Sequence, residues 1–372
     1  MKANKIAYRM IAVAGLTIGL ADLPGCATTY DKKPMAPEQS TITVDSVPTA
    51  EQGGLYIAAA DGFFKKQGLT VKIKPITGGE EAIPDIQSGK AQIVGGNYVS
   101  FVLAEVAGRA NGKPASFRVV APACNIQPGS EALYVRPGSP YKSVAALAEN
   151  HATVGLNTPR GVGQVMLGAL MQDNGYSLGD VHQVLPPSGF PALVSMLRDG
   201  RVDAAWLPQP FATVAQQQYG AVQIADFDQG SVQDFPFTGY IGATNWVRTH
   251  PSTVAAFTRA LAKGQQVADT NRKALEDAME KYAKLPPIVA DTMPYDTYPL
   301  NTNDTELQRV SNAMFEFGLT PGLKRPYRMA SMLSPGHHQL PSLTVAPLFT
   351  MPQPEIATDQ KPAACQHPEQ GE

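Results

Sequence analysis

Apolar residues along the chain follow two alternating patterns. Residues 71–76 alternate apolar and polar side chains as a strand does, whereas residues 55–66 repeat apolar side chains at helical spacing. The pattern predicts strands at Thr41–Val44, Val71–Ile76, Ala91–Gly95, Phe117–Ala121, Ala152–Leu156, Val181–Leu185, Val202–Leu207 and Val222–Ala225. It predicts helices at Leu55–Lys66, Glu80–Ser88, Tyr98–Arg109, Val144–Ala148, Gly163–Asp173 and Phe190–Arg198. Such alternation favours an α/β fold with mainly parallel sheets and crossover helices.

A longer helical run follows. It starts at Pro251, a residue suited to the first helical position, and its apolar side chains fall mostly on one face as far as Tyr282. The sequence therefore predicts one long helix here.

Two passages rich in turn-forming residues, 127–143 and 234–247, divide the chain. They predict two lobes joined by a two-stranded hinge: lobe I at 40–135 plus 242–334, and lobe II at 136–241. A cleft between two such lobes is a natural place for a small ligand.

The N-terminal residues 1–25 have the pattern of a targeting segment. Lys2, Lys5 and Arg9 precede the apolar run Met10–Ala21, which is too short to span a membrane. The run leads to Leu-Pro-Gly-Cys, which resembles a bacterial lipobox and makes Cys26 the residue to be lipidated. The resemblance implies export and a lipid anchor on the outer face of the cytoplasmic membrane. A plain signal peptide is the alternative.

Polar, proline-containing residues 26–39 suit a tether, and the proline-rich residues 335–372 suit a disordered tail. The formal net charge of -2 gives no indication of nucleic-acid binding. The three cysteines have no spacing that indicates a metal site, so we expect neither metal nor cofactor.

Loops that follow the predicted strands carry glycines and short polar side chains. Glycine allows close backbone approach to a ligand, and a helix that starts after such a loop presents unpaired N–H groups. In an open parallel sheet, ligands bind at these carboxyl ends of the strands. The candidate ligand-binding residues are Glu51, Gln52, Gly53, Gly54, Gly78, Gly79, Glu80, Asn97, Tyr98, Thr158, Arg160, Gly161, Gly163, Ser188, Phe190, Trp206 and Gln209.

Several of these candidates have a second interpretation. The glycine pairs fit turn and cap chemistry, Arg160 could point to solvent, and Trp206 could lie in the core as well as in the wall of a cleft. Gly161 and Gly163 satisfy G-x-G, but Met166 stands where a dinucleotide loop has its third glycine.

Four segments, 53–73, 78–101, 153–181 and 185–211, resemble the solute-binding proteins of bacterial ABC importers in the group for nitrate, sulfonate, taurine and thiamine-pyrimidine precursors. The resemblance covers about Thr41 to Met332. It implies a type II periplasmic-binding-protein fold, a monomer, a small-molecule solute and the transmembrane subunits of an ABC permease as partners. An anion of the nitrate, sulfonate or taurine type would use helix N-termini and Arg160, whereas a thiamine-type pyrimidine would use aromatic walls and carboxylates such as Glu51.

Catalysis is not expected. A pyrimidine synthase that resembles these binding proteins needs a histidine in lobe I and a cysteine-rich motif, but the first histidine here is His151 and lobe I has only Cys124 before the hinge. The motifs of nucleophilic hydrolases, zinc proteases and P-loop enzymes are also lacking.

Overall fold

The computed structural model describes residues 35–112, 116–158 and 160–333. The chain divides into two units, residues 1–36 and residues 37–372. The helices, strands and sites described lie in the second unit. Cys26, the predicted signal peptide and the predicted tail lie outside the described residues.

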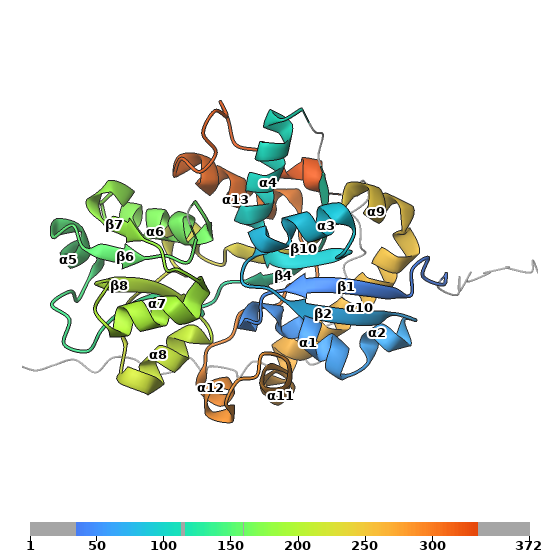
Figure 1. Cartoon of the computed structure of the whole chain (residues 1–372), viewed down its shortest axis with the longest axis horizontal. Helices are drawn as coiled ribbons and strands as arrows, with labels where there is room; N and C mark the ends of the chain where they lie inside the picture. The colour runs from blue at the N-terminus through green and yellow to red at the C-terminus, as the bar shows by residue number, and fades with distance from the viewer. Residues whose placement is uncertain (1–34, 113–115, 159, 334–372) are drawn as a thin grey trace, which may run out of the picture. The chain divides into compact units, whose positions relative to one another are not determined.

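The first sheet has the strand order β2-β1-β3-β10-β4 (Figure 1). Strand β1 pairs in parallel with β2 and β3, and β10 runs antiparallel to both of its neighbours. Only one strand of the five is thus reversed. The strands are β1 (Thr41–Ser46), β2 (Thr70–Pro75), β3 (Ile93–Asn97), β4 (Phe117–Asn125) and β10 (Pro236–Ala243).

Helices cover both faces of this sheet (Figure 1). On one face, α1 and α10 pack together over a core that includes Ile42, Leu55 and Phe257. On the other face, α3, α4 and α13 contact β10. The helices are α1 (Gly53–Ala60), α2 (Phe63–Lys66), α3 (Ile83–Ser88), α4 (Tyr98–Ala110), α9 (Thr244–Thr249), α10 (Pro251–Thr270) and α13 (Asp304–Glu316).

The second sheet repeats the plan with the order β7-β6-β8-β5-β9. Its reversed strand is β5, which is antiparallel to β8 and β9. Helices α7 and α8 contact β8, and α6 presents Gly163 to Trp206 of the same strand. The elements are β5 (Glu131–Val135), α5 (Val144–Glu149), β6 (Thr153–Gly155), α6 (Val162–Asp173), β7 (His182–Val184), α7 (Gly189–Arg198), β8 (Ala204–Pro208), α8 (Phe211–Tyr219) and β9 (Val222–Asp226).

The chain passes between the sheets twice, at residues 126–130 and 227–235. These crossings come before the predicted lobe limits, because β5 pairs in the second sheet and β10 in the first. Two further helices, α11 (Arg272–Tyr282) and α12 (Pro287–Thr292), follow α10, and α12 contacts α8 of the second sheet.

The α/β fold class predicted from the sequence is confirmed, with two five-stranded sheets flanked by helices. The single helix predicted from Pro251 to Tyr282 is wrong. Asn271 leaves the helical conformation, with φ -137° and ψ 87°, and its side chain accepts from Ala274 N to start α11. An asparagine favours such an N-cap over a helix interior.

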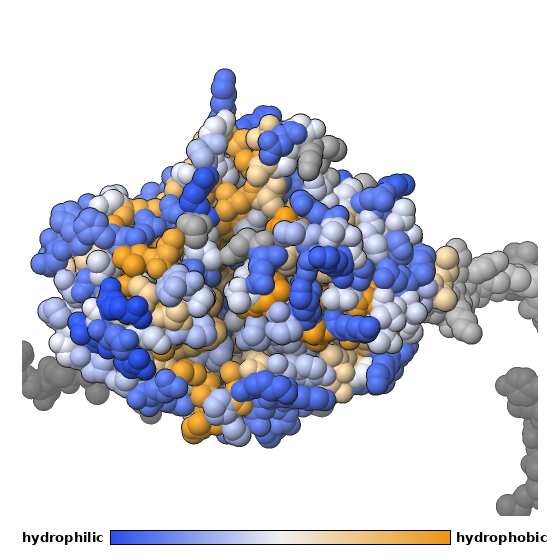
Figure 2. Space-filling view, in the orientation of Figure 1, coloured by the Kyte–Doolittle hydropathy of each residue, from blue (hydrophilic) through white to orange (hydrophobic). Residues whose placement is uncertain are grey.

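Apolar side chains gather mainly in the two cores. On the surface in Figure 2, hydrophobic residues form separate groups among hydrophilic ones. Large exposed hydrophobic side chains include Leu185, Ile288 and Leu300. Within the described ranges, no helix has the length and apolar character needed to cross a membrane.

Candidate ligand-binding site

Three carboxylates meet where the two sheets are connected. Glu51 lies in the 3₁₀ helix η1 (Ala50–Gln52) after β1, Glu131 is the first residue of β5, and Asp296 follows α12. Glu131 is 1% exposed and Asp296 is 7% exposed, while Glu51 is partly buried. They are close enough for the charge of Asp296 to raise the pKa of Glu51, and for the charges of Glu51 and Asp296 to raise the pKa of Glu131.

The backbone holds each carboxylate at the end of a strand. Glu131 lies opposite Pro208, the last residue of the parallel strand β8. Asp296 precedes Thr297, whose backbone exchanges two hydrogen bonds with Asn125 at the end of β4. All three side chains therefore stand at the carboxyl ends of strands, the position at which α/β sheets bind ligands.

Burial and mutual repulsion perturb these groups. Burial, and after it the charge of Asp296, raise the pKa of Glu51 to about 8. Burial also raises the pKa of Asp296 to about 7, against hydrogen bonds from Ser130 and Cys124 that lower it. The pKa of Glu131 is raised by burial and by the charges of Glu51 and Asp296. Near neutral pH the cluster therefore holds protons that exposed carboxylates would release.

No lysine, arginine or histidine among the described residues forms an ion pair with any of these carboxylates. Glu131 has one strong partner, because Trp206 Nε1 donates to its Oε2 at 2.6 Å. The buried thiol of Cys124 also lies beside the cluster, and burial, Asp296 and Glu51 raise its pKa. The cluster is thus rich in hydrogen-bond acceptors and poor in cations.

Several buried polar atoms near these strand ends have no hydrogen-bond partner in the described part of the chain. They are Asp296 Oδ1, both side-chain polar atoms of Gln52 and the Tyr98 hydroxyl. Gln52 is 0% exposed and Tyr98 is 1% exposed. An unsatisfied buried polar group costs about 1–3 kcal/mol. Buried polar atoms left without partners gather at functional sites, where a bound molecule can satisfy them.

Trp206 is buried in this structure, and its predicted contact with a ligand stays a prediction. It is 1% exposed, and its ring meets those of Phe190 and Phe237 edge-on, with ring centroids 5.3 Å and 6.5 Å apart. A Cβ on Gly163 would overlap its ring. Trp206 belongs to the core, with its indole N–H holding Glu131. Phe190, 7% exposed, is likewise mostly buried.

The first predicted glycine pair serves helix packing. A Cβ on Gly53 would overlap Leu275 and approach Tyr298 Oη at 2.7 Å, and one on Gly54 would lie 2.5 Å from Gln265 Cγ. Both residues sit in the first turn of α1, directly after Glu51 and Gln52. Ligand contact through their N–H groups stays a prediction.

The second and third loops of the first sheet lie side by side. Gly79 is close to Gly96, since a Cβ on Gly96 would come within 3.1 Å of Gly79 Cα. Gly78 directly precedes Gly79 in the chain. Asn97 caps α4 by accepting from Ser100 N at 2.8 Å. Tyr98 is buried against Gly239 of β10. The side chain of Glu80 lies outside the described part of the structure.

The predicted ligand-binding residues around the second sheet do not gather in one place. Arg160 is exposed, with φ +49°, and its Nη2 donates to Leu319 O at 2.8 Å, so it is tied to the segment after α13. Gly161 caps α6 and packs against Thr158, where a Cβ would overlap the Thr158 hydroxyl. Ser188 precedes α7 and is exposed.

Gln209 joins β8 to the first crossing. Its Nε2 donates to Gly129 O at 3.0 Å and its Oε1 accepts from Thr213 Oγ1 at 2.8 Å. It is 2% exposed and both of its polar atoms are bonded within the protein. The described interactions thus give Gln209 a structural role beside Glu131.

Reasoning from the sequence missed Glu131 and Asp296. Both carry a signal in retrospect: Glu131 opens the apolar stretch Ala132–Val135, and Asp296 lies between Tyr295 and Tyr298 in a proline-containing loop. A charge embedded among apolar residues is rarely buried without a partner. Across the described ranges, no group of His, Cys, Asp and Glu is arranged to hold a metal ion.

A sequence model of the family described as NMT1/THI5 like matches residues 49–273. No curated protein matches the sequence. Solved structures match at low identity. The alkanesulfonate-binding protein SsuA from Xanthomonas axonopodis pv. citri, bound to MOPS, is 14% identical with a TM-score of 0.66, over 79% of this chain and 98% of that one.

Two further structures widen the range of functions seen on this fold. The periplasmic nitrate-binding protein NrtA from Synechocystis PCC 6803 is 15% identical with a TM-score of 0.64, over 78% of this chain and 84% of that one. The desulfurization enzyme DSZB is 15% identical with a TM-score of 0.60, over 80% and 97%. At these identities the matches show a shared fold, that of periplasmic binding proteins, which also serves an enzyme.

Proposed function

The chain belongs to the NMT1/THI5-like family, and from this premise we propose that it is the extracytoplasmic solute-binding protein of an ABC importer. The observation that carries the proposal is the cluster of Glu51, Glu131 and Asp296 with unpartnered polar atoms beside it. A fold shared with sulfonate- and nitrate-binding proteins supports the same role.

The solute carries amino or other N–H donors. Buried carboxyl groups need hydrogen-bond partners, and in their ionised form they accept from N–H donors and repel nitrate or a sulfonate unless that ligand also brings a positive charge. An aminopyrimidine of the thiamine-precursor type meets this requirement, since its amino group donates and its ring is flat. The acidic cluster therefore favours the pyrimidine alternative over a simple anion.

Binding would act by closing the two lobes. Glu51 follows a strand of the first sheet and Glu131 begins a strand of the second, so a solute bonded to both joins the lobes. The solute then stabilises the closed state over the open state by the difference between its binding free energies for the two states. The crossings at 126–130 and 227–235 would serve as the hinge, and the closed form would deliver the solute to the permease.

A binding role is favoured over catalysis by the groups around the cluster. The described ranges contain three histidines: His151 and His182 have their rings near each other, His250 is stacked on Trp246, and none is among the groups that perturb the carboxylates of the cluster. The cluster supplies acceptors that would orient a solute. Export and a lipid anchor at Cys26 complete the proposal and rest on the N-terminal sequence pattern.

Calorimetric titration of the purified protein tests the solute class. The panel is an aminopyrimidine, taurine, an alkanesulfonate and nitrate, in the same buffer at pH 8. We expect the aminopyrimidine to bind most tightly. Tighter binding of nitrate or the alkanesulfonate would overturn the assignment of an N–H-donating solute.

A further inference from the structure

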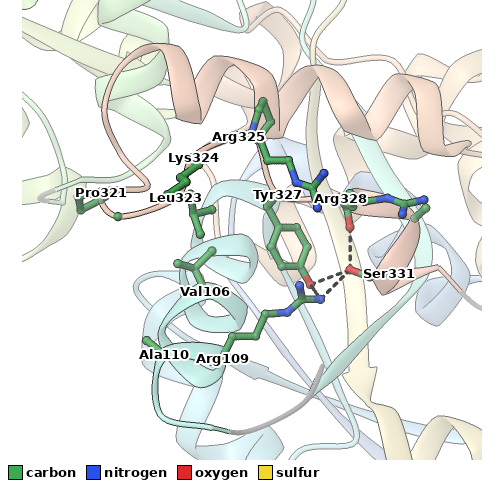
Figure 3. A pocket seen from close by; sticks show the side chains of 13 residues that line it. Val106, Arg109, Ala110, Pro321, Leu323, Lys324, Arg325, Tyr327, Arg328 and Ser331 are labelled. Carbon is green, nitrogen blue, oxygen red and sulfur yellow. Dashed lines mark hydrogen bonds between the residues drawn. The ribbon is translucent and has the colours of Figure 1, made fainter.

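A second site lies on the surface at the C-terminal end of α4. A groove of about 890 Å³ runs between this helix end and residues 321–331 (Figure 3). That volume lies in the range of about 300–1,000 Å³ that holds small-molecule ligands. The groove shares no lining residue with the acidic cluster, so it is independent of the proposed solute site.

One end of the groove is strongly basic. The guanidinium groups of Arg109 and Arg325 lie at this end, Arg328 and Lys324 also line the groove, and no acidic residue does (Figure 3). Among the described residues, none of these four forms an ion pair. The buried Glu105 interacts electrostatically with Arg109, but the four cations still give the groove a net positive charge, which a multivalent anion would offset.

The basic end is ordered by aromatic and hydroxyl groups. The guanidinium of Arg109 lies over the ring of Tyr327, 4.5 Å from its centroid, and its Nη2 donates to Tyr327 Oη and Ser331 Oγ at 3.1 Å each (Figure 3). The buried Glu105 lies beneath Tyr327: its Oε1 accepts from Ser116 N and Phe117 N, and its Oε2 accepts from Tyr327 Oη at 3.4 Å, although Glu105 itself does not line the groove. Arg109 is thus fixed, with its remaining N–H donors free to bind an oxyanion.

The other end of the groove is apolar. Val106, Ala110 and Leu323 line it, on the side away from the guanidinium of Arg109 in Figure 3. A ligand that fills the whole groove therefore has an anionic head and an apolar body. Guanidinium groups match the geometry of phosphate oxygens and bind them bidentately.

We propose that the groove between α4 and residues 321–331 binds a phosphate-bearing amphiphile, with Arg109, Arg325 and Arg328 on the phosphate and Val106 and Leu323 on the apolar part. Both a free organic phosphate and the headgroup of an anionic lipid have this chemistry.

Two probes distinguish these sources on the full-length protein: phenyl phosphate in a calorimetric titration, and co-sedimentation with phosphatidylglycerol vesicles. The test variant is Arg325→Gln/Arg328→Gln. The matched control is Lys65→Gln/Lys142→Gln, which removes the same charge from exposed positions outside the groove. We expect the test variant to weaken binding about tenfold or more, and the control to change it little.

Arginine-dependent binding of phenyl phosphate assigns the site to a soluble organic phosphate. Arginine-dependent binding of vesicles without heat from phenyl phosphate assigns it to a lipid headgroup. If neither probe binds, or if the lysine control weakens binding as much as the arginine variant does, the proposal is overturned.

Discussion

At the scale of single residues, the protein is defined by three buried or partly buried carboxyl groups that form no ion pair with any lysine, arginine or histidine of the described residues. Burial raises the pKa of all three groups, Asp296 adds to the rise for Glu51, and Glu51 and Asp296 add to the rise for Glu131, whose side chain accepts a short hydrogen bond from the indole of Trp206. Such an arrangement destabilises the free protein and stabilises a complex with a donor-rich ligand. The same residues therefore govern both stability and affinity.

The stability of the free protein should fall as pH rises. The pKa of Glu51 is about 8 in the folded state against 4.5 for an ordinary glutamate, and that of Asp296 is about 7 against 3.8. When folding raises the pKa of a carboxyl group, that group's contribution to stability is fully present below its pKa in the unfolded state. The contribution is lost as the pH rises through its pKa in the folded state. We expect the melting temperature to decrease from pH 5 to pH 8.

Glu51→Gln should flatten this decrease, because the glutamine does not titrate. Glu38, with its pKa lowered to about 2 despite the opposing effect of burial, is ionised throughout the window and does not contribute to the slope. A melting temperature that rises between pH 5 and pH 8, in wild type and variant alike, would exclude buried protonated carboxylates.

The sequence predicted much of the site's location and little of its chemistry. Glu51 and Gln52 could be predicted because they lie in the loop after the first predicted strand. Glu131 and Asp296 were not, because each becomes buried only through partners distant in sequence, at Pro208 and Asn125. The burial of Trp206 was not predicted, because the pattern along a strand cannot tell a cleft wall from a core that is covered by α6.

At the scale of elements, close contact between α1 and α10 fixes the loop that carries Glu51. Gly264 of α10 lies against Gly54 and Ala58 of α1, and a Cβ on Gly264 would overlap Gly54 O. Glu51 and Gln52 sit immediately before α1, so the position of this helix sets theirs. Small residues at a helix crossing allow such a short approach.

Gly264→Ala should lower the free energy of unfolding by about 1–3 kcal/mol, because the added methyl group must push the two helices apart. Gly108→Ala in α4 is the matched control, since among the described residues a Cβ there meets only Ser116 Oγ at 3.9 Å. That control should be neutral, or stabilising by up to about 1 kcal/mol. Chemical denaturation measures both variants, and equal effects would show that the α1–α10 contact is not tight.

Some helices and strands could be predicted from local sequence patterns and others could not. The parallel strands and most of their crossover helices were predicted because each has a local pattern, whereas the crossover helix α8 was not predicted. Strands β5 and β10 were missed, because they lie in the turn-rich passages and pair in sheets that the chain has just entered or re-entered. The break at Asn271 was missed because the apolar face continues on both sides of it.

At the scale of the whole molecule, two sheets of one plan are joined by two crossings, and the acidic cluster stands at that junction. The central claim is that a donor-rich solute binds carboxylates of both sheets at once. A ligand confined to one sheet would depend on Glu51 or on Glu131, but not on both.

The most direct test is the affinity for an aminopyrimidine, measured by calorimetry at pH 8 for wild type, Glu51→Gln, Glu131→Gln and the control Asp277→Asn, whose side chain is 61% exposed in α11. Loss of a charged hydrogen bond to the solute should weaken binding at least about tenfold in each of the two glutamate variants. Asp277→Asn should bind as wild type does. Wild-type affinity in either glutamate variant would contradict a solute held between the two sheets.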